Sequence, residues 1–89
     1  MKRIYADFNN KDPDGYVRLN TIGTIADLAR TSILLEDGTQ FIVCDGDLVA
    51  GIIVRSSGAE GIWRGEVISG PFEIHDAGAE RLLRESDIL

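Results

Sequence analysis

Residues 32–55 constrain the fold most, because three short apolar segments follow one another there with only tight-turn signals between them. The segments cover residues 32–36, 40–44 and 48–54, and the linkers carry the pairs Asp37-Gly38 and Asp45-Gly46. Short apolar runs bounded by Asp and Gly are typical of β-strands, and Asp-Gly between two such runs indicates a hairpin. We therefore predict consecutive antiparallel strands across this region.

The N-terminal part has the period-two alternation of strands at residues 3–8 and 15–22. The loop between them carries Pro13, Asp14 and Gly15, which suit successive positions of a tight turn. These two segments are expected to pair as a β-hairpin.

Two more strands are expected at residues 62–68 and 69–74, where Pro71 confines the second to an edge or a strand start. Gly51 and Gly65, within strands, predict bulges or sharp bends that curl the sheet.

Helical spacing appears twice. A short helical turn is predicted near residues 25–30 with Thr24 as its N-cap, and it would close one end of the sheet. A C-terminal helix is predicted near residues 77–86 with Asp76 as its cap. We expect this helix to dock on its own barrel, although an amphipathic terminal helix also suits a partner's groove.

The 89 residues therefore predict one domain, residues 1–89, of five or six short strands in mostly sequential antiparallel order. The expected fold is mainly β: a small, partly open antiparallel barrel, SH3-like as the first choice and OB-like as the second.

The chain has nine Lys and Arg against fifteen Asp and Glu, a net charge of −6, and no basic run. Nucleic acids and anionic membranes are therefore unlikely partners, since both require clustered positive charge. The single cysteine, Cys44, forms no internal disulfide and is expected to be a buried, inert thiol. No segment has the length of a signal peptide's apolar core or a membrane helix, which favours a cytoplasmic location.

The first loop resembles the start of a calcium loop, because Asn10, Asp12, Asp14 and Gly15 occupy positions 1, 3, 5 and 6 of the EF-hand spacing. Position 12 is Thr21, which cannot supply two oxygens, and the flanks alternate as strands. We therefore expect a turn here and predict no metal ligands or cofactor.

No pattern of catalytic residues stands out. The only histidine, His75, precedes the expected cap Asp76, and the acidic pair Asp45 and Asp47 flanks a turn glycine. Carboxylates beside turn glycines are usually solvated, and neither a nucleophile elbow nor a phosphate-binding loop occurs. We predict no catalytic residues and no enzymatic activity.

Surface aromatic and arginine side chains are the better candidates for function. The only tryptophan, Trp63, is either the largest core residue or, if it faces outward, a contact beside Arg55 or Arg64. Tyr5 and Tyr16 lie on the polar sides of their strands, as a cross-strand pair or as exposed contacts. The candidate partner-binding surface comprises Trp63, Arg64, Arg55, Tyr5 and Tyr16.

The segments IYADFNN, VRLNTIGTIADL and LEDGTQFIV, spread over about the first half of the chain, resemble a set of small bacterial proteins without an assigned activity. The resemblance implies a free-standing, cytoplasmic bacterial protein and brings no catalytic residue or cofactor.

Three functions follow as hypotheses. The first is a non-enzymatic module that binds a protein partner or itself. The second is an acidic inhibitor or antitoxin-like protein that masks a basic, nucleic-acid-binding surface, which requires Asp12, Asp14, Asp45 and Asp47 to gather at one end. The third is a small hydrolase or weak metal-binding protein, which requires His75 to meet a nucleophile or a carboxylate pair.

Overall fold

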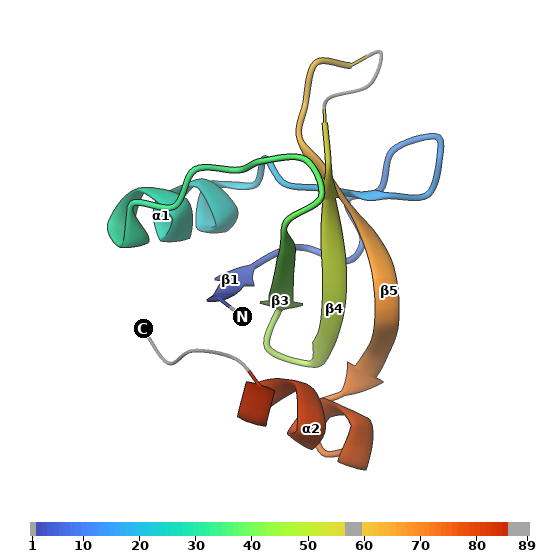
Figure 1. Ribbon diagram of the computed structural model, residues 1–89. Helices are drawn as coiled ribbons and strands as arrows, with labels where there is room; N and C mark the ends of the chain where they lie inside the picture. Colours follow the sequence, from blue (N-terminus) through green and yellow to red (C-terminus); the bar gives the residue numbers. More distant parts are fainter. Residues whose placement is uncertain (1, 57–59, 86–89) are drawn as a thin grey trace.

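The computed structural model describes residues 2–56 and 60–85 as one sheet with two helices (Figure 1). The elements follow the order β1 (Lys2–Tyr5), β2 (Val17–Arg18), α1 (Ile22–Thr31), β3 (Gln40–Cys44), β4 (Leu48–Arg55), β5 (Arg64–Glu73) and α2 (Ala77–Glu85). The five strands form a mixed half-barrel in the order β1-β3-β4-β5-β2. The prediction of a small, mainly β protein is confirmed, but the sheet is mixed rather than antiparallel.

The predicted hairpin between residues 3–8 and 15–22 is wrong. β1 pairs in parallel with β3, while the two-residue β2 pairs with β5. A turn does form near the expected place, since the Asp12 N–H donates to the Tyr16 carbonyl at 2.8 Å. The chain leaves the sheet after β1, and Phe8 fills the core instead of continuing a strand. Alternation shows which side chains are buried, but it does not identify the neighbouring strand.

The next strands were partly foreseen. The β3–β4 hairpin is confirmed, with Cys44 opposite Val49. The predicted strand at 32–36 is wrong: these residues link α1 to β3 without joining the sheet. The two strands predicted at 62–74 form the single strand β5. The β4–β5 register shifts around Gly51, as predicted, whereas no shift occurs at Gly65.

The sheet has an apolar cluster on each face. The inner cluster fills the half-barrel and comprises Ile4, Ala6, Phe8, Val17, Leu19, Phe41, Val43, Ala50, Ile52 and Val54. The outer cluster lies under α2 and comprises Ile42, Val49, Ala79 and Leu82. The predicted docking of the C-terminal helix on its own sheet is confirmed, and the predicted end of that helix at Ser86 lies outside the described residues.

The helix α1 is a ten-residue helix rather than the short turn predicted at 25–30, and its N-cap is Thr21 rather than Thr24. The Thr21 side-chain oxygen accepts a hydrogen bond from the Thr24 N–H at 3.3 Å. Thr24 is fully buried, and its hydroxyl donates to the Tyr5 carbonyl at 2.7 Å. This bond ties α1 to β1. Within the part of the chain that the structure describes, no helix is long and apolar enough to cross a membrane.

Candidate protein-contact surfaces

Three arginines stand in a row on the outer face of β2, β5 and β4. Arg18 lies directly opposite Arg64 in the register of β2 and β5, and Arg64 lies opposite Arg55 in that of β5 and β4. Directly opposite residues of antiparallel strands project from the same face, so the three guanidinium groups share one surface. Each of them is paired with a carboxylate: Arg18 with Glu60 at 2.7 Å, Arg55 with Glu66 at 2.7 Å, and Arg64 with two aspartates.

Arg64 joins the first loop to β5. Its Nη1 lies 3.0 Å from Oδ2 of Asp12 and 2.9 Å from Oδ2 of Asp14, and its guanidinium lies 4.6 Å from the centre of the Tyr16 ring. The other Asp12 oxygen, Oδ1, accepts the N–H groups of Asp14 and Tyr16, each at 2.9 Å. Burial by itself raises the pKa of Asp12, but the Tyr16 amide and the Arg64 guanidinium outweigh it and hold that pKa below its ordinary value.

The residues with calcium-loop spacing, Asn10, Asp12 and Asp14, therefore form hydrogen bonds and ion pairs that hold the first loop in this fold. The carboxylates of Asp12 and Asp14 are occupied by Arg64, and the Asn10 side chain bonds to Asn20 and Arg18. Across residues 2–56 and 60–85, no three His, Cys, Asp or Glu side chains are grouped so that they could hold a metal ion.

The structure distributes the five residues of the predicted binding surface over three places. Arg64, Arg55 and Tyr16 come together on the outer face. Trp63 is half-buried and packs against the inner cluster. Of the two alternatives predicted for this residue, the structure therefore shows the one in which it contributes to the core. Tyr5 lies at the β1 edge, where its ring packs so closely on α1 that a methyl group on Gly23 would approach its Cδ1 to 2.7 Å. As a binding surface, the set stays a prediction.

The three most exposed large apolar side chains of the described residues lie in and after α1. Ile22 is 89% exposed and Ile25 is 55% exposed, and Ala26 and Ala29 are exposed as well. The spacing of these four residues places them side by side along the helix, and we call them the α1 stripe. Leu34, in the segment that follows the helix, is 84% exposed.

Sequence reasoning missed the α1 stripe because it took Thr24 as the N-cap of a short helical turn near residues 25–30. With Thr21 as N-cap, the buried Thr24 and the half-buried Leu28 face the sheet instead. The signal was present: Thr24, Leu28 and Thr31 have the i, i+4, i+7 spacing of one helical face. An apolar outward stripe is unusual for a surface helix, which normally turns such a stripe toward its own core.

The acidic pairs do not gather at one end. Asp12 and Asp14 lie in the loop before β2, whereas Asp45 and Asp47 lie in the β3–β4 turn at the opposite end of the sheet (Figure 1). Oδ1 of Asp45 accepts the N–H groups of Asp47 and Leu48, both at 2.9 Å. These aspartates therefore serve as turn residues.

The residues considered for catalysis are not joined to one another. His75 lines a shallow cleft with Asp47 and Glu73, but it makes no hydrogen bond or ion pair with any described residue. Cys44 is half-buried on the α2 side of the sheet, and burial raises the pKa of its thiol. A raised pKa keeps the thiol protonated and weakly nucleophilic.

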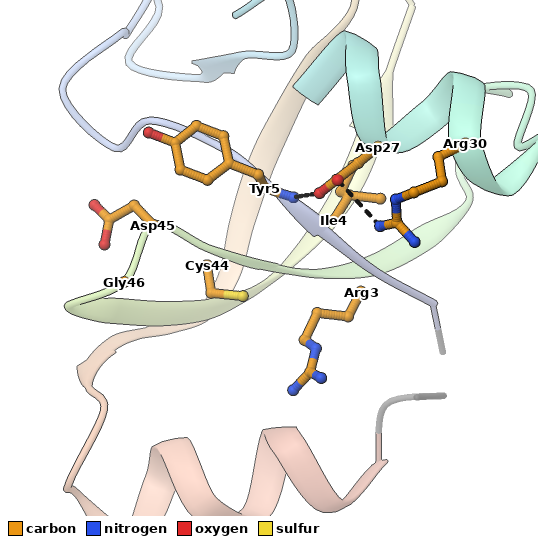
Figure 2. Close-up of a pocket in the computed structure, with 8 residues that line it drawn as sticks. All are labelled: Arg3, Ile4, Tyr5, Asp27, Arg30, Cys44, Asp45 and Gly46. Carbon is orange, nitrogen blue, oxygen red and sulfur yellow. Dashed lines mark hydrogen bonds and ion pairs between the residues drawn. The ribbon is translucent and has the colours of Figure 1, made fainter. Parts of the chain in front are cut away.

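The second cleft lies at the β1 edge, between α1 and the β3–β4 turn (Figure 2). Its volume is about 350 Å³, and it is lined by Arg3, Ile4, Tyr5, Asp27, Arg30, Cys44, Asp45 and Gly46. Asp27 is engaged on both of its oxygens, since Oδ2 accepts the Tyr5 N–H at 2.8 Å and Oδ1 pairs with Arg30 at 3.1 Å.

No protein-family model, curated protein or solved structure matches this chain. The likeness to small bacterial proteins therefore stays a prediction.

Proposed function

We propose that the protein is a non-enzymatic protein-interaction module whose main contact surface is the α1 stripe. The observation that supports this is the exposure of Ile22 and Ile25, 89% and 55%, next to each other on a helix. Single exposed apolar residues are ordinary on protein surfaces, whereas adjacent ones indicate a contact site.

The packing of α1 leaves this stripe available. Asp27 accepts the Tyr5 N–H and the Thr24 hydroxyl donates to the Tyr5 carbonyl, and these two bonds fix the opposite face of the helix against β1. Ile22 and Ile25 thus sit on a helix that is already held in place, so a partner would order few additional groups on binding. Preorganisation of this kind reduces the entropy lost on association.

The energetic contribution of the stripe suits a reversible interaction. Burying an isoleucine fully contributes about 1.5–3 kcal/mol, and Ile22 and Ile25 are largely exposed before binding. Two such side chains provide a small apolar centre, and small interfaces are typical of transient complexes.

The test compares the wild-type protein with the double variant Ile22→Ser/Ile25→Ser as bait for capture from a native lysate, followed by mass spectrometry. Ile68→Ser, which removes an exposed isoleucine from β5, is the matched control. A protein that binds the wild type and the control but not the double variant is the expected result. Equal recovery with all three baits, with circular dichroism showing that each is folded, would reject the stripe as the contact surface.

Self-association through the same surface belongs to this proposal, and light scattering after gel filtration measures it. If the stripe joins two copies, the double variant is monomeric at concentrations at which the wild type dimerises. The outer-face residues Arg55, Arg64 and Tyr16 form a second candidate surface. However, both arginines are already paired with carboxylates, and the Arg64 guanidinium also packs on the Tyr16 ring. A partner would have to replace those interactions, which favours the α1 stripe.

A cytoplasmic location and an SH3-like arrangement of the half-barrel are part of the proposal. The unpaired Cys44 suits a reducing compartment, and the antiparallel run β3-β4-β5-β2 suits a small curled sheet. The separation of the acidic pairs does not favour the hypothesis of an acidic inhibitor or antitoxin-like protein.

A further inference from the structure

The edge of β1 is closed at one residue and open at another. At Tyr5, Asp27 accepts the N–H at 2.8 Å and the Thr24 hydroxyl donates to the carbonyl at 2.7 Å, so both backbone groups point away from β3 and toward α1. Because the direction of backbone groups alternates along a strand, the N–H and carbonyl of Arg3 point to the same side. The backbone of Arg3 makes no hydrogen bond outside the sheet to any described residue. An edge of this kind can accept an added strand.

The Arg3 side chain, too, has no partner among the described residues. It is half-buried, extends into the cleft beside Cys44 (Figure 2), and makes no hydrogen bond or ion pair within residues 2–56 and 60–85. Arg18, Arg30, Arg55, Arg64 and Arg84 all have carboxylate partners. Arg81, which is exposed on α2, is the other arginine that has no carboxylate partner in the part of the chain that the structure describes. A partly desolvated guanidinium without an acceptor is costly, and a carboxylate supplied by a ligand would offset that cost.

The cleft at this edge is lined by two cations, Arg3 and Arg30, and two acids, Asp27 and Asp45. Arg3 belongs to β1, and Arg30 lies across the cleft and pairs with Asp27. Asp27 does not neutralise Arg3, because Arg30 and the Tyr5 N–H occupy its two oxygens. Asp45, the other acid in the cleft, uses Oδ1 within its own turn. Arg3 is therefore the cation of this cleft that pairs with no carboxylate of a described residue.

We propose that the open edge of β1 and the adjoining cleft bind an extended peptide segment with an acidic side chain, which adds to the sheet beside Arg3. The backbone of the peptide pairs with the N–H and carbonyl of Arg3, and the acidic side chain, on the same face of the sheet, reaches the Arg3 guanidinium. Because α1 closes the edge at Tyr5, the added strand ends there, which fixes its position. This proposal rests on the proposed role as an interaction module, but it uses a surface separate from the α1 stripe.

The test is a titration monitored by ¹H–¹⁵N correlation NMR with two blocked pentapeptides, Thr-Glu-Val-Glu-Thr and its control Thr-Gln-Val-Gln-Thr. The Glu peptide is expected to shift the amide signals of Arg3, Tyr5, Arg30 and Gly46, residues that line the cleft. The Gln peptide is expected to bind at least about tenfold more weakly, since it loses a charge-assisted hydrogen bond. Arg3→Gln is expected to weaken binding of the Glu peptide by the same factor.

Two control variants separate this site from other surfaces. Arg81→Gln removes the other unpaired arginine, and Ile22→Ser/Ile25→Ser removes the α1 stripe; both are expected to bind the Glu peptide as the wild type does. If the double variant fails to capture a protein from lysate but still binds the peptide, the two surfaces are independent.

Several results would overturn the proposal. They are the absence of localised shifts at about 5 mM peptide, equal affinity for the two peptides, unchanged affinity of Arg3→Gln, or shifts confined to other elements. Acetate that binds as tightly as the Glu peptide would also overturn it, because a strand edge should gain from the peptide backbone. If Arg3→Gln does not fold, the comparison of the two peptides on the wild type still decides the outcome.

Discussion

The substitution Gly65→Ala tests how closely β5 packs over the inner cluster. A methyl group on residue 65 would project toward Ile52, at 2.5 Å from its Cδ1, 3.2 Å from its Cβ and 3.4 Å from its Cγ1. Ile52 is fully buried and belongs to the inner cluster, so its side chain has little room to move away. Gly65 lies between Val17 of β2 and Val54 of β4, and the methyl group therefore meets the most crowded part of the half-barrel.

The expected cost follows from two opposing effects. Overpacking a filled core costs about 1–3 kcal/mol, whereas replacing glycine with alanine restricts the unfolded chain and returns about 0.4–1 kcal/mol. We expect Gly65→Ala to lower the free energy of unfolding by about 1–2 kcal/mol. Ile52→Val removes the Cδ1 atom that clashes, and by itself it should cost about 1 kcal/mol.

The double variant Gly65→Ala/Ile52→Val provides the decisive measurement. Without Cδ1 the remaining contacts, 3.2 and 3.4 Å, can be relieved by shifts of a few tenths of an ångström, so the double variant should be about as stable as Ile52→Val alone. Urea denaturation followed by the fluorescence of Trp63, which packs against the inner cluster, measures all four proteins. Additive losses in the double variant would refute the steric explanation, as would a Gly65→Ala variant as stable as the wild type.

Two further predictions concern the first loop and α1. Because folding lowers the pKa of Asp12, its ionised carboxylate stabilises the fold at pH values above the ordinary carboxyl pKa of about 3.9. This contribution is lost as the pH falls through the lower pKa of the folded state. Asp12→Asn should therefore have a lower free energy of unfolding than the wild type at about pH 7, and this difference should narrow toward about pH 2. Urea denaturation measures it, and a difference in the free energy of unfolding that stays constant across this pH range would contradict the prediction. Thr24→Val keeps the side-chain shape but removes the hydroxyl that donates to the Tyr5 carbonyl, and should cost about 1–3 kcal/mol because the carbonyl loses its donor. Thr39→Val, at an exposed position before β3, is the control, and equal stability of the two variants would exclude this role.

The candidate surfaces were predictable only in part. The sequence singled out Arg55, Arg64 and Tyr16 as candidate contact residues. It did not indicate the carboxylates that pair with the two arginines, which come from the loop before β2 and from β5. The Asp12–Arg64 pair spans 52 residues of sequence, and no local pattern indicates it. Arg18, the third member of the row, was not singled out, because its place beside Arg64 depends on the pairing of β2 with β5. The β1 edge could not be foreseen at all while β1 was expected to pair with the following segment.

Local chemistry alone determined the elements that depend on neighbours in the chain. The α2 helix followed from its periodic apolar residues, and the β3–β4 turn followed from the Asp and Gly at its tip. Tertiary structure decided the parallel pairing of β1 with β3, the length of α1 and the face that it exposes. These features depend on contacts between distant residues, such as Thr24 with Tyr5 and Ile4 with the inner cluster. The period-two pattern of residues 3–8 marked what would be buried, and only the competition among all strands for the same core determined which strand would lie beside them.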